Sequence, residues 1–229
     1  MRQKPRSLLA VRILLIRNYS DMTIQWYGEG CFKIQSSDTV ILIDPVDKST
    51  GLSAPRFKHD ILMKTSLEAL SPEKDFAREE SEAYVIYGPG EYEIQGVQIT
   101  GWPLKKDLES GSLNSIFRVK MEDLRLGFLG GLASFNEPEM LEELGDIDIL
   151  FIPGGNTPYL SQGEAAKLVR QIEPRMVIPS HIKAKGLKRK SQGPEAFLKE
   201  LSLSAQPQEK ITIKFKDLTE KMQAGVLTV

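Results

Sequence analysis

One strand of this chain reads Met176-Val177-Ile178-Pro179-Ser180-His181, an apolar run that delivers a histidine at its C-terminal end. Strand ends that open into loops are where α/β folds place binding and catalytic groups. A zinc site needs three or four Cys, His or carboxylate ligands. The chain has only one other histidine, His59. The pattern therefore predicts an α/β enzyme framework from which most zinc ligands are absent.

The composition of the 229 residues is that of one large α/β domain. Hydrophobic residues make up 41% of the chain, which is enough for a substantial core. The net charge of −1 gives no overall field toward nucleic acid or anionic membrane. No run approaches the roughly 20 apolar residues needed to cross a bilayer. The single cysteine, Cys31, excludes an internal disulfide, and we expect a cytoplasmic protein.

Residues 1–22 do not share the regular pattern of the rest of the chain. They begin basic and become mostly apolar, as in a signal peptide, but Arg12 interrupts the apolar run and no small-residue cleavage site follows. We expect a leader or an extra strand over 1–22, or a natural start at Met22. A single domain is predicted over 23–229.

Short β-rich runs separated by Gly, Pro or Ser-Ser-Asp turns dominate the chain, and three segments have helical spacing. The predicted strands are Thr23–Tyr27, Cys31–Gln35, Thr39–Asp44, Asp60–Thr65, Tyr84–Tyr87, Glu91–Ile94, Val97–Thr100, Ser115–Lys120, Leu124–Leu129, Ile147–Ile152, Arg175–Pro179 and Ile211–Phe215. The predicted helices are Glu137–Leu144, Gly163–Ile172 and Pro194–Leu203.

The two halves of the chain echo one another. Three segments recur about 85 to 88 residues later: Phe32-Lys33-Ile34 as Phe117-Arg118-Val119, Val40–Ile43 as Leu126–Leu129, and Asp60-Ile61-Leu62 as Asp148-Ile149-Leu150. Nearly constant spacing indicates duplicated halves, although coincidence among short apolar strands is the alternative. Duplication predicts an α/β fold with two sheets face to face and helices outside, a four-layer αββα sandwich of two pseudo-repeated halves.

Seven phrases in order resemble the metallo-β-lactamase superfamily, and most closely its branches similar to ascorbate-6-phosphate lactonase and to small bacterial Zn-dependent hydrolases. The phrases are Ile24-Gln25-Trp26-Tyr27-Gly28-Glu29-Gly30-Cys31-Phe32-Lys33-Ile34, Val40-Ile41-Leu42-Ile43-Asp44-Pro45, Asp60-Ile61-Leu62, Tyr87-Gly88-Pro89-Gly90-Glu91-Tyr92-Glu93-Ile94, Asn114-Ser115-Ile116-Phe117, Asp148-Ile149-Leu150-Phe151-Ile152-Pro153-Gly154-Gly155 and Ile178-Pro179-Ser180-His181. The resemblance implies the fold of that superfamily.

The resemblance also implies a one- or two-metal site, and most of its ligand positions are changed here. The family's Thr-His-x-His-x-Asp-His loop is replaced by Thr65-Ser66-Leu67-Glu68-Ala69-Leu70-Ser71. Glu29 stands where a histidine is usual, Leu104-Lys105-Lys106-Asp107 stands where another is usual, and Gly130-Gly131 replaces a Gly-Asp step. Only the final histidine matches, as His181. One imidazole cannot hold zinc at useful affinity, so we expect no zinc or other cofactor unless the site is non-standard.

The candidate site residues each have more than one interpretation. His181 is an inherited ligand, a general base or, most simply, a structural histidine hydrogen-bonded at a strand end. Glu29, Asp44 and Glu68 could converge, and carboxylates suit Mg²⁺, Ca²⁺ or Mn²⁺ rather than zinc. The weak metal candidates are therefore Glu29, Glu68 and His181.

A basic run follows His181 and predicts a loop at the rim of the pocket that could hold an anion, or that is simply solvated. The candidate residues for a pocket or anion site are Ser66, Lys106, Asp107, His181, Lys183, Lys185, Lys188 and Arg189.

Three functions stay open on this sequence. The leading hypothesis is a non-catalytic or ligand-binding relative of the Zn-dependent hydrolases, which binds a small molecule or a protein. The second is a metal-dependent hydrolase with a non-standard site of Glu29, Glu68 and His181, acting on a lactone, ester or phosphodiester. The third, disfavoured by the balanced charge, is a nucleic-acid-binding module. Homo-oligomerisation stays open, and no membrane partner is expected.

Overall fold

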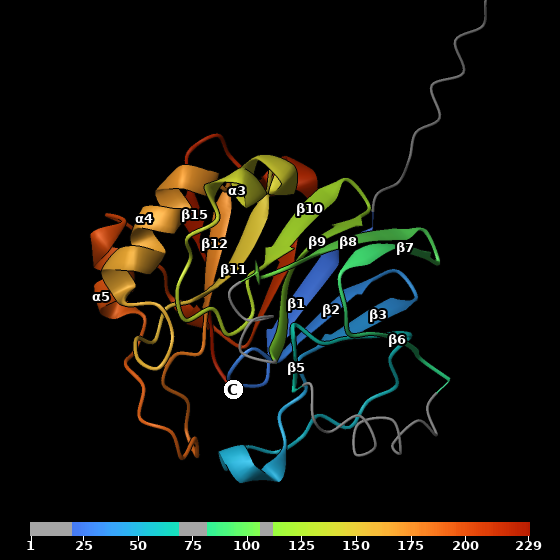
Figure 1. Ribbon diagram of the computed structural model, residues 1–229, viewed down its shortest axis with the longest axis horizontal. Coiled ribbons are helices and arrows are strands. Elements are labelled where there is room, and N and C mark those ends of the chain that lie inside the picture. The colour runs from blue at the N-terminus through green and yellow to red at the C-terminus, as the bar shows by residue number, and fades with distance from the viewer. Residues whose placement is uncertain (1–19, 69–81, 106–111) are drawn as a thin grey trace, which may run out of the picture.

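Two β-sheets stacked face to face form the centre of the molecule (Figure 1). The computed structural model describes residues 20–68, 82–105 and 112–229. The six-stranded sheet has the order β14 (Lys210–Ile213), β1 (Met22–Trp26), β2 (Phe32–Ser36), β3 (Thr39–Ile43), β4 (Ile61–Met63) and β6 (Tyr84–Ile86). The eight-stranded sheet has the order β15 (Gln223–Ala224), β12 (Met176–Ser180), β11 (Ile149–Pro153), β10 (Leu124–Phe128), β9 (Ser112–Met121), β8 (Val97–Pro103) and β7 (Gly90–Ile94), with β5 (Ser66–Glu68) pairing β9. A separate ladder joins β13 (Pro207–Gln208) to β16 (Val226–Leu227).

The main core lies between the two sheets. Strands β1 and β2 alternate buried and half-buried residues because one face of the sheet packs on that core. Aromatic rings from both sheets meet there: Phe32 lies edge-on to Phe151 at 4.7 Å between ring centroids, and Phe151 stacks on Phe128 at 4.4 Å. By contrast, β11 and β12 are buried along their whole length. Their outer face must therefore be covered as well.

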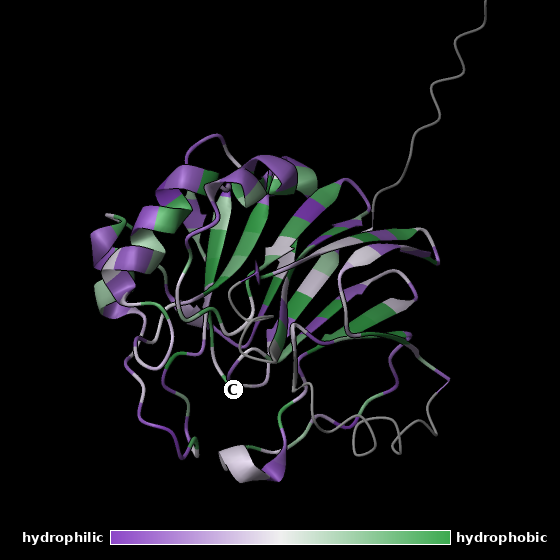
Figure 2. Ribbon diagram, viewed as in Figure 1, coloured by the Kyte–Doolittle hydropathy of each residue, from purple (hydrophilic) through white to green (hydrophobic). Residues whose placement is uncertain are grey.

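In the part of the chain that the structure describes, three helices cover that outer face: α3 (Pro138–Leu144), α4 (Gln162–Ile172) and α5 (Glu195–Glu200). Figure 2 shows their polar residues turned outward and the apolar strands behind them. Helix α4 begins at a capping box, in which the Ser161 side chain and the Glu164 side chain each bond the other's backbone N–H. Among the residues that the structure describes, no helix is long and apolar enough to cross a membrane.

The outer face of the six-stranded sheet is covered differently in the described part of the chain. Val46 and Leu52, which flank the short 3-10 helix η1 (Lys48–Thr50), pack there with Leu42 and Cys31 in a small apolar cluster. The α/β sandwich predicted from the sequence is confirmed.

The predicted duplication is visible in the strand pairing. Strands β1, β2, β3, β4 and β6 pair antiparallel, antiparallel, parallel and parallel, and β8 to β12 repeat the same sequence of directions. An equivalent side-chain hydrogen bond is present in each half. Asp60 Oδ2 accepts from the Val40 N–H at 2.8 Å, and Asp148 Oδ2 accepts from the Arg125 N–H at 2.9 Å. Sheet topology and hydrogen bonding thus support duplication over coincidence.

Most predicted elements are present, with shifted ends. Strand β5 is not predicted from the sequence, because Ser66–Glu68 lies in the stretch that replaces the family's ligand loop. Its backbone partner is β9, where Ser66 faces Asn114. Helix α5 is shorter than the predicted Pro194–Leu203, since the chain already turns after Glu200.

Candidate functional site

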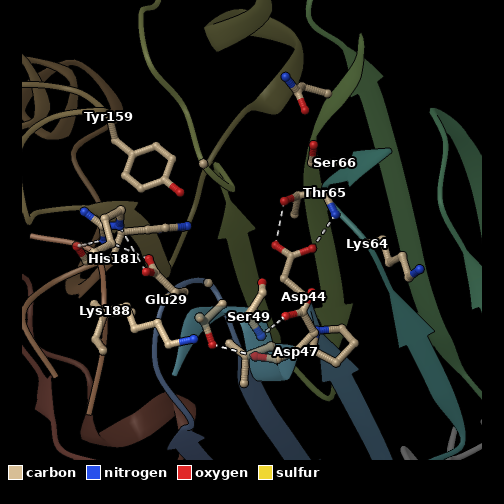
Figure 3. A pocket seen from close by; sticks show the side chains of 18 residues that line it. Glu29, Asp44, Asp47, Ser49, Lys64, Thr65, Ser66, Tyr159, His181 and Lys188 are labelled. Atoms are coloured by element: carbon tan, nitrogen blue, oxygen red, sulfur yellow. Dashed lines mark hydrogen bonds and ion pairs between the residues drawn. The ribbon is translucent and has the colours of Figure 1, made fainter. Parts of the chain in front are cut away.

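A cleft of about 590 Å³ opens where several strands end. Its walls come from the turn between β1 and β2, from the loop after β3 that carries η1, and from the segment between β4 and β5. The loop after β12 closes the other side (Figure 3). Strand ends therefore deliver the side chains to this cleft, as the sequence predicted for His181.

Three residues that line the cleft have positive φ although none is glycine. Glu29 has φ 50°, Asp44 has φ 41° and His181 has φ 54°. Left-handed backbone is uncommon for such residues and tends to cluster at functional sites. Asp44 and His181 each follow the last residue of a strand, and Glu29 lies in the β1–β2 turn. The unusual backbone aims three polar residues at one cleft.

Asp44 is hydrogen-bonded to Thr65, which lies in the segment after β4. Its Oδ1 accepts from the Thr65 N–H at 2.7 Å, and its Oδ2 accepts from the Thr65 hydroxyl at 2.5 Å. Burial raises the pKa of the Asp44 carboxyl to about 6, and the two hydrogen bonds from Thr65 oppose that rise. Thr65, the one residue retained from the family's ligand loop, thus holds a carboxylate in place.

His181 is only 5% exposed and lies at the inner end of the cleft. Its Nδ1 is 2.9 Å from the Ser180 hydroxyl, and its ring lies against Tyr159 with 4.2 Å between centroids. Burial, and secondarily the charge of Arg189, lowers the pKa of His181 to about 3. His181 is therefore a neutral imidazole at physiological pH. The prediction of a histidine hydrogen-bonded at a strand end is confirmed.

Glu29 forms an ion pair with Arg189, which is distant in sequence. The Arg189 Nε donates to Glu29 Oε1 at 3.0 Å and Nη2 donates to Oε2 at 2.8 Å, a bidentate ion pair. Arg189 also donates to the His181 carbonyl at 3.0 Å and lies 5.0 Å from the centre of the Tyr159 ring. The Glu29 and Arg189 side chains are 13% and 22% exposed. In this structure the Glu29 carboxylate and the Arg189 guanidinium, predicted as a weak metal candidate and as an anion-site residue, pair with each other.

The basic run after His181 does lie at the rim, but only part of it lines the cleft. Lys188 lines it, and the Lys188 N–H donates to the Thr50 carbonyl at 2.9 Å, which fixes this loop against η1. Lys183 and Lys185 do not line the cleft and are exposed. The Lys183 N–H instead bonds the Gln192 carbonyl, and this turns that part of the loop away.

The remaining predicted site residues divide into two groups. Ser66 lines the cleft and is exposed, as expected. Glu68 ends β5 opposite Ser112, and its side chain lies outside what the structure describes, as do Lys106 and Asp107 altogether. His59 contacts the Phe57 carbonyl through Nδ1 and does not line the cleft.

The described donor groups of the cleft are mostly engaged with other parts of the chain. Within residues 20–68, 82–105 and 112–229, no three His, Cys, Asp or Glu side chains are grouped to hold a metal ion. Both Glu29 oxygens bond Arg189, both Asp44 oxygens accept from Thr65, and His181 Nδ1 bonds Ser180, which leaves His181 Nε2 and one lone pair on each Asp44 oxygen available. A zinc site with three protein ligands does not fit these described residues.

Sequence reasoning missed Tyr159, Gly30 and Gly131. Tyr159 packs on His181, and burial raises the pKa of its hydroxyl. Gly30 and Gly131 lie beside the imidazole: a Cβ on Gly30 would be 3.3 Å from His181 Nε2, and one on Gly131 would be 3.7 Å from it. From the sequence, the Gly130-Gly131 step indicates only that an aspartate is absent. Its position beside His181 follows from the fold.

Comparisons with known proteins agree with this fold. A family model described as Beta-lactamase superfamily domain matches residues 23–181. A UPF0173 metal-dependent hydrolase of Pyrococcus horikoshii is 29% identical over 69% of this chain and 83% of its own length. One of Pyrobaculum calidifontis is 24% identical over 77% of this chain and 90% of its own.

Among solved structures, a Thermotoga maritima protein described as a Zn-dependent hydrolase of the metallo-beta-lactamase superfamily has a TM-score of 0.73 and 26% identity, covering 91% of this chain and 100% of that one.

Proposed function

The chain belongs to the beta-lactamase superfamily. We propose that it is a metal-independent, ligand-binding member of this superfamily that holds a small anionic molecule in its cleft. One observation carries the proposal. The carboxylate at position 29, where the resemblance implies a metal-binding histidine, is paired with a cation that the chain itself supplies, Arg189. Arg189 is permanently charged and forms two hydrogen bonds to Glu29, so a divalent ion would have to displace it.

Lysine side chains support an anion as the ligand. Arg189 neutralises Glu29, and the carboxylates of Asp44 and Asp47 line the cleft together with Lys64 and Lys188. Lys183, Lys185 and Lys190 are exposed on the loop that carries Lys188 and add to the positive potential at the rim. The hydroxyls of Ser49 and Ser66 also line the cleft.

A ligand titration with a matched pair of variants tests this proposal. We expect inorganic phosphate to raise the melting temperature of the wild-type protein, while Zn²⁺ and Mn²⁺ leave it unchanged. Lys188→Gln should weaken phosphate binding several-fold. Lys185→Gln removes the same charge from the same loop without touching the cleft, and should weaken it much less. Equal effects of the two variants would mean that the loop acts only as a diffuse positive surface.

A second candidate function rests on the relatives, two of which are described as metal-dependent hydrolases. It requires Glu29 to leave Arg189 and to act with His181 and Glu68. Turnover of a lactone, ester or phosphodiester that Mn²⁺ stimulates and His181→Ala abolishes would favour this candidate over ours.

A further inference from the structure

His181 carries a hydrogen-bond donor that the described protein atoms do not satisfy. Ser180 is buried, and the one hydrogen bond of its hydroxyl to a described residue joins it to His181 Nδ1, at 2.9 Å. Because a buried hydroxyl proton needs an acceptor, the Ser180 hydroxyl donates to Nδ1. The proton of the neutral imidazole is then on Nε2. No hydrogen bond joins Nε2 to any described residue, and His181 lines the cleft.

Gly30 lies between that nitrogen and the Asp44 carboxylate. A Cβ on Gly30 would lie 3.3 Å from His181 Nε2 and 3.2 Å from Asp44 Oδ2, whereas Tyr159 fills the space beside Gly131, where a Cβ would lie 2.9 Å from its ring. Because position 30 has no side chain, a narrow notch remains in the cleft wall, with the His181 imidazole on one side and the Asp44 carboxylate on the other (Figure 3). Oδ2 already accepts from Thr65, but a carboxylate oxygen has a second lone pair.

A group that faces a donor and an acceptor at once must be able to accept and to donate. A carboxylate or phosphate oxygen would meet the N–H well but would face the Asp44 oxygen unfavourably. A carbonyl could not donate to Asp44. A hydroxyl satisfies both neighbours, because it accepts through its lone pairs and donates through its proton.

We propose that the inner end of the cleft is a hydroxyl subsite, in which a ligand hydroxyl accepts from His181 Nε2 and donates to Asp44 Oδ2. This inference rests on the proposed anion binding at Lys188 and deepens it. The ligand then carries hydroxyl groups at one end and an anionic group at the other, as a phosphorylated polyol or sugar does. Ser180 is a positioning residue, since it sets which imidazole nitrogen carries the proton.

The proton position can be measured in the wild-type protein, because the chain has only two histidines. Long-range ¹H–¹⁵N spectra of the histidine rings should show His181 as the neutral Nε2–H tautomer, with His59 as the internal reference and His59→Gln for assignment. Ser180→Ala should shift His181 toward a mixture of tautomers. A wild-type His181 protonated on Nδ1 would overturn the inference.

Two ligands that differ only in their hydroxyls test the subsite itself. Glycerol 1-phosphate and n-propyl phosphate share the phosphate and the three-carbon chain. Two satisfied hydrogen bonds in a buried notch predict about tenfold tighter binding of glycerol 1-phosphate by calorimetry. His181→Phe keeps a ring but removes the donor, and should abolish the difference.

Equal affinity of the wild-type protein for the two phosphates would refute the hydroxyl subsite. If Lys188→Gln then weakened both ligands alike, the proposed anion binding would still stand. Failure of both ligands to bind at millimolar concentration would overturn the inference, while uptake of Zn²⁺ or Mn²⁺ by the wild-type protein would instead overturn the proposed function.

Discussion

Replacing Arg189 with alanine should destabilise the protein far more than a typical surface substitution. The change removes both hydrogen bonds to Glu29, the bond to the His181 carbonyl and the contact with the Tyr159 ring. It leaves the Glu29 carboxylate, 13% exposed, without a counter-charge. Breaking a fully buried pair costs about 3–5 kcal/mol and an exposed pair about 0–1 kcal/mol. We expect an intermediate loss of about 2–3 kcal/mol for this partly buried pair.

Denaturant unfolding of four proteins measures that loss: wild type, Arg189→Ala, Glu29→Gln and the double variant. The coupling energy between the two sites should be about 1–3 kcal/mol, because each partner matters mainly through the other. Lys188→Ala, which removes the neighbouring cation, is the matched control and should cost within about 0.5 kcal/mol. A coupling energy near zero would refute the claim that Arg189 is the internal counter-ion of Glu29.

Three further predictions concern protonation and the repeat. His181 should stay neutral to well below pH 5 in ring NMR titrations while His59 serves as the second signal, and an ordinary titration of both rings would contradict the burial of His181. Because the folded pKa of His181 lies below its unfolded value, its contribution to stability is present above about pH 6.5 and is lost as pH falls toward 3; His181→Gln should therefore lessen acid destabilisation between those limits in urea titrations. Asp148→Ala should cost about 3 kcal/mol and Asp60→Ala about 1 kcal/mol, because both accept a backbone N–H but only Asp148 also pairs with Arg125; equal losses in chemical unfolding would show that the ion pair adds nothing.

The sequence predicted the sheets well because the burial of a strand determines the local pattern of its apolar residues. A strand with one face on the core alternates apolar and polar residues, as Phe32–Ser36 does, and a strand buried on both faces is continuously apolar, as Ile149–Pro153 is. The repeat was also readable, since Asp60 and Asp148 precede equivalent strands. Strand β5 was not, because Ser66–Glu68 gains its order from pairing with a distant strand.

The site was predictable only in part. His181 was found because its strand is local in sequence. The Glu29–Arg189 pair joins residues 160 positions apart, so the local sequence around either residue does not predict its partner. Likewise, nothing in the spacing of the basic run separates Lys188, which lines the cleft, from Lys185, which does not. That difference arises from backbone contacts of the loop with η1 and with Gln192.

Metal content is the most direct test of the central claim that Arg189 has taken over the role of counter-ion in this cleft. The full chain, purified without chelators from cells grown with added zinc and manganese, should contain far less than one metal ion per molecule by elemental analysis. It should also give no binding isotherm with Zn²⁺ or Mn²⁺ by calorimetry. One equivalent of tightly bound metal, lost on replacing His181 with alanine, would contradict the account.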